Sequence, residues 1–567
     1  MTSTFSGLEI GKLGLFAQQT ALNTTGHNIS NANTEGYTRQ RVNMEAMPAF
    51  PYPSAVNNRS AGQVGTGVWV SSIERLRTAF LDLQFRGENK NAGEYGARTD
   101  TLEKIENILN EPTDSGLQKT MDDFWGAWQQ LSANPKDTSA REVVRQKATT
   151  MTESFAFIQR EMIQQQNNVN EDIGTKTTEI QGYLDTVAKL NAQINDIVPH
   201  GYTPNDLYDQ RDLILDKLSK SMDIEVKPVT NNGKDTGMVD VYIKGTNVNL
   251  VSEKAASVVK AEASTAAPPN NTLRDGTTTK LDINIYCATL RSGTTPPQAP
   301  DQSNLATWTP ANPNYQFSEG GELKGLLASR DTILPDYMTR ISNLATKIAT
   351  EVNKVHKSGK DLDGNQQGGV DYAPTITPIP PSTKSALPFF VSKQAYETAK
   401  VASPTNPNPH NDNDPTTWNW MNTPPTGPGD MIVNPLIMKS VNKIAASDPN
   451  SGTGDNKTAL AIYALKEQTN MVFGGAGGET GSFDSYTRSI ISKLGSETRE
   501  AQRMKTNVES LTSEVDNRRQ SVSGVSLDEE MSNMIKFQHS YSACARTITA
   551  MDEMLDQIIN KMGLVGR

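Results

Sequence analysis

Residues 144–194 read VRQKATTMTESFAFIQREMIQQQNNVNEDIGTKTTEIQGYLDTVAKLNAQI. Apolar side chains recur three or four residues apart through this stretch, which places them on one face of an α-helix. Such spacing over this length is typical of coiled-coil packing, and a helix over 139–198 would be roughly 80–90 Å long. The stripe consists of Val144, Ala148, Met151, Phe155, Ile158, Met162, Val169, Ile173, Ile180, Leu184, Val187 and Ile194.

More helix is predicted on both sides of this stretch. Residues from about 99 to 199 are expected to be nearly all helical, and a shorter helix follows with Leu207, Ile214 and Leu218. The same three-and-four spacing returns between Leu323 and Val352, and again between Tyr486 and Val515. These segments predict a helical rod formed by residues 61–222, 315–358 and 434–519.

Two insertions interrupt the rod. Val239, Val241 and Ile243 alternate with polar residues, and Asn231-Asn232-Gly233 before them is a hairpin signal. Residues 223–314 are therefore predicted to be a β-rich domain. Residues 359–433 are rich in Pro, Thr, Asn and Gly, and they predict a second, irregular or β-rich insertion anchored by aromatic residues, namely Phe389, Phe390, Trp418 and Trp420.

Both ends of the chain predict amphipathic helices. Leu8, Leu15, Leu22 and Ile29 recur every seven residues, and the pattern stops in the turn formers of 31–37. Gly524 separates the previous helix from a last one, whose stripe contains Leu527, Met531, Met534, Tyr541, Ala545, Ile548, Leu555, Ile559 and Met562. Ser6 with Glu9, and Ser526 with Glu529, have the spacing of capping boxes.

The order of these segments predicts a multidomain, mainly α fold with nested, discontinuous domains and inserted β-rich parts. An isolated amphipathic helix is marginally stable in water, so both ends need an apolar partner. We therefore expect residues 1–60 and 520–567 to pair in one terminal coiled-coil assembly domain. The insertions should project at the opposite end.

Composition excludes several classes of partner. The 567-residue chain has a formal net charge of −10 and a pI near 5.3, which disfavours binding to nucleic acid or an anionic membrane. The amino-terminal sequence lacks the features of a cleaved signal peptide, and no run approaches the ~20 apolar residues of a membrane span. Cys287 and Cys544 are too few and too distant to indicate a disulfide framework or a zinc site.

Motifs that carry catalysis are weak. The five histidines have no metal-site spacing, and Gly474–Gly478 lacks the Gly-Lys-Ser/Thr that holds nucleotide phosphates, so it is expected to separate two helices. Asp361-Leu362-Asp363-Gly364 resembles the start of a calcium loop, but Gln366 and Tyr372 occupy positions that need Gly and Glu. We expect no enzyme activity, cofactor or metal.

The two ends carry specific motifs. Residues 21–37, ALNTTGHNISNANTEGY, closely resemble the amino-terminal signature of bacterial flagellar rod, hook and hook-associated proteins. LDEEM at 527–531, Phe537, Tyr541, and DEML at 552–555 resemble the matching carboxy-terminal motif. Three inner segments narrow the resemblance to the hook-associated protein 1 family: NDLYDQRD at 205–212, GGELKGLLASRD at 320–331, and Asn353 with His356, Gly359 and DLDG at 361–364.

The resemblance implies a structural subunit of the hook–filament junction. Family members leave the cell through the flagellar type III export channel without a cleaved signal, and a chaperone binds their carboxy-terminal helix beforehand. Their terminal helices order into coiled coils on assembly. The implied partners are copies of the chain in a ring, the hook protein and hook-associated protein 3, and the implied location is the extracellular flagellum.

The assembly interface is predicted on the apolar stripes of both ends: Leu8, Leu15, Leu22, Ile29, Leu527, Met531, Tyr541, Ala545, Ile548, Leu555 and Ile559. Two alternatives stay open at this point. The chain could be a hook or rod axial protein, although the long helix at 139–198 argues against this. One insertion could instead carry a binding or enzymatic module displayed at the surface.

Overall fold

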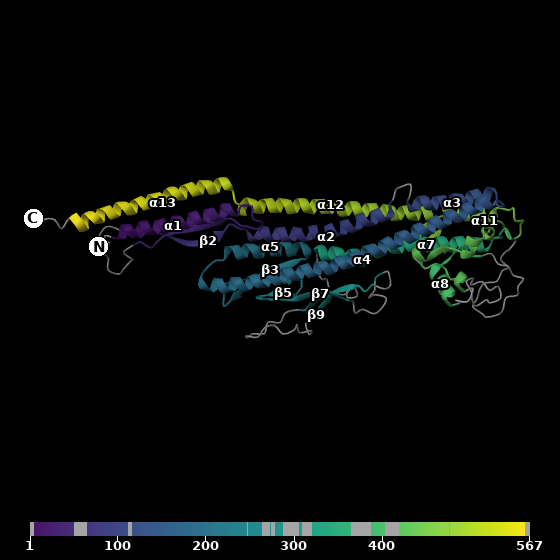
Figure 1. Ribbon diagram of the computed structural model, residues 1–567, viewed down its shortest axis with the longest axis horizontal. Helices are drawn as coiled ribbons and strands as arrows, with labels where there is room; N and C mark the ends of the chain where they lie inside the picture. The colour runs from purple at the N-terminus through teal and green to yellow at the C-terminus, as the bar shows by residue number, and fades with distance from the viewer. Residues whose placement is uncertain are drawn as a thin grey trace, which may run out of the picture.

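The molecule is an elongated rod built on one 60-residue helix, α4 (Thr138–Ile197), which runs along most of its length (Figure 1). The computed structural model describes residues 5–49, 65–110, 116–246, 248–263, 273, 278–286, 305–308, 320–363, 387–402, 419–475 and 477–561. Asp137 caps α4 by accepting a hydrogen bond from the Ser139 amide at 2.8 Å. Every member of the predicted apolar stripe is buried, so the prediction of one long packed helix is confirmed.

Further helices surround α4 and share its core. They are α2 (Ala79–Leu109), α3 (Leu117–Ala133), α5 (Asn205–Ser221), α6 (Glu322–Ala328), α7 (Leu334–Lys357) and α12 (Phe483–Ser523). A π-turn at Ser329–Ile333 joins α6 to α7, and α2 lies against α12 over much of its length. One continuous hydrophobic cluster runs through these helices, and Phe124, Trp128 and Phe155 are fully buried in it.

Helix α2 begins 20 residues before the predicted start at Thr99. Large apolar residues are absent between Phe85 and Tyr95, where Gly93 and other small residues allow neighbouring backbones to approach. A Cβ added at Gly93 would lie 2.1 Å from the Lys220 carbonyl oxygen. A contact of this kind leaves no apolar periodicity in the sequence, which is why the prediction was wrong here.

The first insertion contains two antiparallel sheets beside α4. One has the order β3 (Ile224–Asn231), β4 (Lys234–Ile243), β5 (Asn249–Ser252) and β6 (Ala255–Ala256), and the other has β7 (Val258–Ala263), β8 (Leu281–Tyr286) and β9 (Leu305–Trp308). The predicted hairpin is confirmed: Asn232 and Gly233 both have positive φ between β3 and β4. Asn191 on α4 donates from Nδ2 to the Val239 carbonyl at 2.7 Å, which holds the first sheet on the rod. Cys287 lies outside the described residues.

The described part of the second insertion forms a short two-stranded sheet with small helices. Strand β10 (Phe390–Ser392) pairs with β11 (Met431–Val433), and α8 (Lys393–Ala402) and α9 (Asn419–Asn422) lie beside them. Short helical turns continue the chain as η5 (Pro428–Asp430), α10 (Pro435–Lys439), η6 (Val441–Lys443), α11 (Lys457–Ala464) and η7 (Leu465–Glu467).

Aromatic side chains attach this insertion to the rod. Phe389 and Phe390 are fully buried against Phe124, and Trp420 packs on Tyr396 in a smaller cluster. His356 at the end of α7 holds both sides of the insertion: Nδ1 donates to the Leu387 carbonyl at 2.7 Å and Nε2 accepts from the Ala445 amide at 2.8 Å. Trp418 lies outside the described residues.

The glycine-rich segment after the insertion is a turn. It connects β12 (Met471–Phe473) to β13 (Glu479–Gly481), which are antiparallel partners. The prediction that Gly474–Gly478 separates two helices was therefore wrong. Gly474, Gly475 and Gly477 have positive φ, a backbone conformation that glycine adopts readily.

The two chain ends lie together at one tip of the rod (Figure 1). Helix α1 (Ser6–Ser30) packs on α13 (Leu527–Asp556). A π-helical turn at Gln557–Lys561 follows α13. A two-stranded ribbon of β1 (Gln40–Ala46) and β2 (Val68–Arg75) lies against α1. The predicted pairing of the ends is confirmed, whereas the ribbon was not predicted. Among the described residues, no helix is long and apolar enough to cross a membrane.

Candidate assembly interface at the paired termini

Glycines bring α1 and α13 into close contact. Gly7, Gly11 and Gly14 lie on the face of α1 that meets α13. A Cβ added at Gly11 would lie 2.8 Å from Cγ1 of Ile548, and one added at Gly14 would lie 2.9 Å from Sγ of Cys544. Since Gly7 faces Met551 and Asn28 faces Glu530, the two helices run antiparallel. Ala17, Ala21, Thr24 and Thr25 continue this buried face of small residues.

The heptad residues of α1 flank this contact face. Leu8, Leu15, Leu22 and Ile29 are all half-buried, beside the fully buried small residues. They are therefore partly accessible in the monomer.

The predicted interface residues of α13 fall into two groups. Tyr541, Ala545, Ile548 and Leu555 are half-buried. Leu527, Met531 and Ile559 are exposed, at 49%, 51% and 68% of their surface. Ile535, which the sequence did not single out, is exposed to 56%.

One of the two predicted helix caps is present. Ser526 accepts a hydrogen bond from the Glu529 amide and caps α13. Ser6 is the first residue of α1 rather than its cap, and no side-chain cap is formed there. The Ser6–Glu9 capping box was therefore a wrong prediction.

Asn28 is the centre of a buried hydrogen-bond network. Its Nδ2 donates to the Gln40 carbonyl at 2.9 Å and to Oε2 of Glu530 at 3.1 Å. Its Oδ1 accepts from the Tyr37 hydroxyl at 2.8 Å and from the Gln40 amide at 3.0 Å. His27 Nδ1 lies 2.9 Å from the same hydroxyl. Burial, with the nearby carboxylates of Asp206, Asp209 and Glu530, raises the pKa of Tyr37, so the phenol stays protonated.

Arg39 links this network to the start of α13. Its Nε donates to Oε1 of Glu530 at 2.7 Å, and its Nη1 donates to Oε2 of Glu529 at 2.7 Å. Its backbone amide donates to the Ser523 carbonyl at 2.8 Å, just before the α12–α13 break. Arg39 therefore fixes where α13 leaves the rod relative to α1.

A row of aspartates on α5 joins the terminal module, which consists of α1, α13 and the β1–β2 ribbon, to the rod. Asp209, Asp212 and Asp216 lie on one face, because they are three and four residues apart. Arginines from β2, from the link after it, from α2 and from α12 converge on this row: Arg75, Arg77, Arg86 and Arg519. Arg75 Nη1 lies 2.8 Å from Asp209 and 2.9 Å from Asp212.

Burial and charge act in opposite directions on these carboxyls. Burial works to raise the pKa of Asp212, but Arg77, Arg75 and Arg86 outweigh it, so the pKa lies below its ordinary value. Burial prevails at Asp209 and raises its pKa, although Arg75 and the Thr38 amide both favour the ionised form. The Thr38 amide donates to Oδ2 of Asp209 at 2.9 Å, which ties the loop after α1 to α5.

The motifs quoted from the sequence therefore meet at one place. HNISNANTEGY at 27–37, NDLYDQRD at 205–212 and DEE at 528–530 supply Asn28, Tyr37, Asp209, Asp212 and Glu530 to one network. These residues lie in the quoted motifs, but no role was predicted for them, and Arg39 was not predicted at all. The signal that could have found the network is the polar run directly after an apolar helix.

The contacts described above join helices and loops that are far apart in the chain. Within the described residues, no three His, Cys, Asp or Glu side chains are grouped so that they could hold a metal ion. Asp361, from the calcium-like motif, is buried beside the end of α7, and residues 364–370 lie outside the described part. Cys544 is a free thiol packed on Gly14.

Comparison with known proteins identifies the family. A model of the flagellar hook-associated protein FlgK helical domain matches residues 102–370. Models of the flagella basal body rod protein and of the flagellar basal body rod FlgEFG protein C-terminal match residues 8–38 and 518–561. The latter two matches coincide with α1 and α13.

Full-length relatives agree with these matches. The chain is 34% identical over 575 residues to flagellar hook-associated protein 1 of Bacillus subtilis, covering 100% of both chains. It is 27% identical to flagellar hook-associated protein 1 of Escherichia coli, covering 96% of this chain and 98% of that one. The fold is similar to the flagellar hook junction protein FlgK from Burkholderia pseudomallei, with a TM-score of 0.52 and 16% identity over 78% of this chain and 100% of that chain.

The paired terminal helices, the rod and the full-length match lead to one assignment. The chain belongs to the flagellar hook-associated protein 1 family and is a structural subunit of the bacterial flagellum at the junction between hook and filament.

Proposed function

We propose that the α1–α13 module assembles the chain into a ring of identical copies at the hook–filament junction. The supporting observation is the outward face of α13. Leu527, Met531 and Ile535 lie four residues apart on this face and are about half exposed. Apolar stripes of this kind lie along contacts between helices, and burying each such side chain contributes about 1.5–3 kcal/mol.

The half-buried leucines of α1 fit the same role. Leu8, Leu15 and Leu22 already touch the module with part of their surface, and the remainder is free for a neighbouring copy. Phe5, directly before α1, and Phe16 on α1 are exposed to 56% and 53% and extend the apolar surface. The predicted interface residues thus serve both the monomer and the assembly.

We further propose the hook protein on one side of the ring and hook-associated protein 3 on the other. We also propose that the chain reaches the extracellular flagellum through the type III export channel. Met554, Ile558 and Ile559 leave an apolar surface at the end of α13. A chaperone bound there before export would keep this surface from aggregating.

Charge placed on the outward face of α13 tests the assembly proposal. A strain lacking the chain is complemented with Met531→Asp or Ile535→Asp, and filaments are counted by electron microscopy. Both variants should give intact hooks, shed flagellin and at least tenfold fewer filaments. Ser532→Asp adds the same charge on a different face of the helix and should leave the filaments unchanged.

A control measurement distinguishes loss of assembly from loss of folding in these variants. Circular dichroism of the purified variants should match that of the unchanged chain, because Met531 and Ile535 are exposed. Normal filament numbers with a charge at both positions would show that this face of α13 is not the interface.

A further inference from the structure

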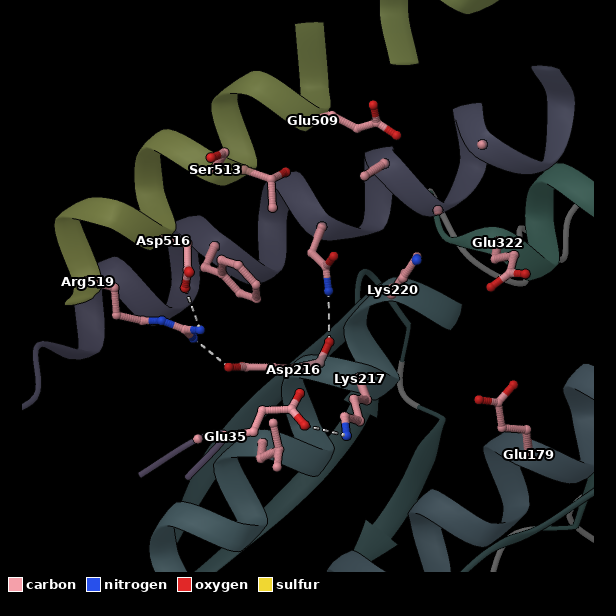
Figure 2. Close-up of a pocket in the computed structure, with 18 of the residues that line it drawn as sticks. Glu35, Glu179, Asp216, Lys217, Lys220, Glu322, Glu509, Ser513, Asp516 and Arg519 are labelled. Atoms are coloured by element: carbon pink, nitrogen blue, oxygen red, sulfur yellow. Dashed lines mark hydrogen bonds and ion pairs between the residues drawn. The ribbon is translucent and has the colours of Figure 1, made fainter. Parts of the chain in front are cut away.

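A long cleft runs along the rod beside the terminal module. It has a volume of about 1180 Å³ and lies between α12 and α2 on one side and α5, α6 and α4 on the other. Figure 2 shows Glu509, Ser513 and Asp516 on α12, with Lys217 and Lys220 on α5 opposite them. Along α12 the lining extends from Lys505 to Ser523, which is roughly 27 Å of helix.

The floor of the cleft is built for close approach. Gly96 on α2 lies in the lining, and a Cβ added there would meet no atom within 4 Å. Ala92, Gly93 and Ala97 lie beside it. A similar face of glycine and alanine residues on α1 lets α13 approach closely in the terminal module.

One buried side-chain amide in the cleft has a donor without a hydrogen-bond partner. Gln165 on α4 lines the cleft and only 6% of it is exposed, yet its Nε2 has no hydrogen-bond partner within the described structure. A buried donor without a partner costs about 1–3 kcal/mol. An occupant that supplies a carbonyl or hydroxyl oxygen would remove this cost.

The charges of the cleft define the kind of occupant. Its lining contains eight acidic and seven basic residues, so it suits neither a polyanion nor a polycation. Most of these charges are paired with each other, such as Lys217 with Glu35 at 3.5 Å and Lys505 with Asp100 at 3.8 Å. Lys104, Asp172 and Glu509 have no ion pair or hydrogen bond among the described residues, which leaves both signs available to a partner that carries both.

We propose that this cleft receives the surface of a second copy of the chain in the assembled ring. One end of the lining consists of residues 32–38 and of Ser523, Gly524 and Val525, where the terminal helices leave the rod. This end lies directly before α13, whose outward face is the proposed contact face. Copies that pack through their terminal helices would bring a neighbouring copy to this end of the cleft. The inference rests on the proposed ring assembly.

Photo-cross-linking tests the occupant directly. The photoreactive amino acid p-benzoylphenylalanine replaces Gly96 in the full chain, and assembled flagella are irradiated and digested for mass spectrometry. The expected product is a dimer whose cross-link joins residue 96 to a peptide of a second copy, absent from the dilute monomer. Gly87 is the matched control, because it lies on the same helix in equally open space but outside the cleft. Its dimer yield should be at least tenfold lower.

Lys104 provides a second position if the residue-96 variant does not fold, because it is exposed at the far end of the cleft. Flagella that assemble normally but give no cross-link to a second copy from either position, or give one only to another protein, would overturn this inference and leave the ring proposal standing. Failure of the unchanged chain to enter the junction would instead overturn the ring proposal.

Discussion

Asn28 and Glu530 are 502 residues apart in the chain and are joined by a hydrogen bond of 3.1 Å between Nδ2 and Oε2. Only 1% and 2% of their surfaces are exposed. This bond closes the molecule on itself at the joint between the terminal module and the rod. Oδ1 and Nδ2 of Asn28 each form two hydrogen bonds. Substitution of Asn28 would therefore leave several buried groups without a hydrogen-bond partner.

Asn28→Ala should loosen the terminal module. The Glu530 carboxylate, the Tyr37 hydroxyl and the Gln40 backbone each lose a partner, at a total cost of about 2–4 kcal/mol. Hydrogen exchange in α1 and α13 should accelerate, while exchange in α4 stays unchanged. Asn23→Ala on the exposed side of α1 is the control. Equal protection in the two variants would contradict a central role for Asn28.

Gly14→Leu should separate α1 from α13. The new side chain would occupy the place of Cys544 Sγ, which lies 2.9 Å from the position of a Cβ. Overpacking of this kind costs about 1–3 kcal/mol. Gly26→Leu is the matched control, since a Cβ there meets nothing within 4 Å and both changes alter helix propensity equally.

A smaller pair of changes checks the cause. Gly14→Ala combined with Cys544→Ala removes the close atom, so the difference in unfolding free energy between Gly14→Ala and Gly26→Ala should vanish. If the difference persisted in this background, the loss would come from something other than the Gly14–Cys544 contact.

Asp212→Asn should weaken the joint by about 3–5 kcal/mol, because Arg75, Arg77 and Arg86 would lose their shared carboxylate. The lowered pKa of Asp212 means that its ionised form contributes stability above the ordinary value of 3.8, and that this stability is lost as the pH falls further. Limited proteolysis near residues 523–526 measures the opening. Asp100→Asn, which removes an exposed carboxylate, should not change the cleavage rate.

His356 should make the second insertion sensitive to mild acid. Burial lowers its pKa from 6.5 to about 4, against the favourable bond to the Leu387 carbonyl and with help from Arg141. The unfolded chain therefore binds more protons between pH 6.5 and 4, and stability falls as the pH drops through this window. This pKa shift corresponds to a loss of at most about 3 kcal/mol in the free energy of unfolding across the window.

The acid effect is measured by urea unfolding at stepwise pH. His356→Gln keeps an oxygen to accept from the Ala445 amide but cannot titrate, so its stability should depend less on pH between 6.5 and 4. Parallel pH profiles of the two proteins would show that the pKa of His356 does not differ between the folded and the unfolded chain.

Large apolar residues made most of the rod predictable. The stripe from Val144 to Ile194 fixed α4, because each of its side chains enters one continuous core. Asn232-Gly233 fixed a hairpin, because only certain residues accept positive φ at both turn positions. Both patterns predict local structure from neighbouring residues, and the folded chain keeps that local structure.

Close backbone contacts and polar networks were not predictable in the same way. The middle of α2 and the α1–α13 face are packed through Gly93, Gly11 and Gly14, which contribute nothing to an apolar stripe. Periodicity located the leucines of α1 but could not show that the small residues beside them form the contact. The partners of Asn28 lie hundreds of residues away, so only the folded chain brings them together.

The antiparallel pairing of α1 with α13 also sets an order of folding. Helix α1 contacts a partner that lies hundreds of residues later in the chain, and a 25-residue helix with one apolar side is marginal alone. Joining ends so distant by random search is entropically unfavourable and slow. The antiparallel packing of α12 on α2 shortens this search, since it carries Gly524 back to the ribbon before α13 must find α1. We therefore expect helix α1 to become stable only after α13 has packed on it, and to be released first when the joint is strained.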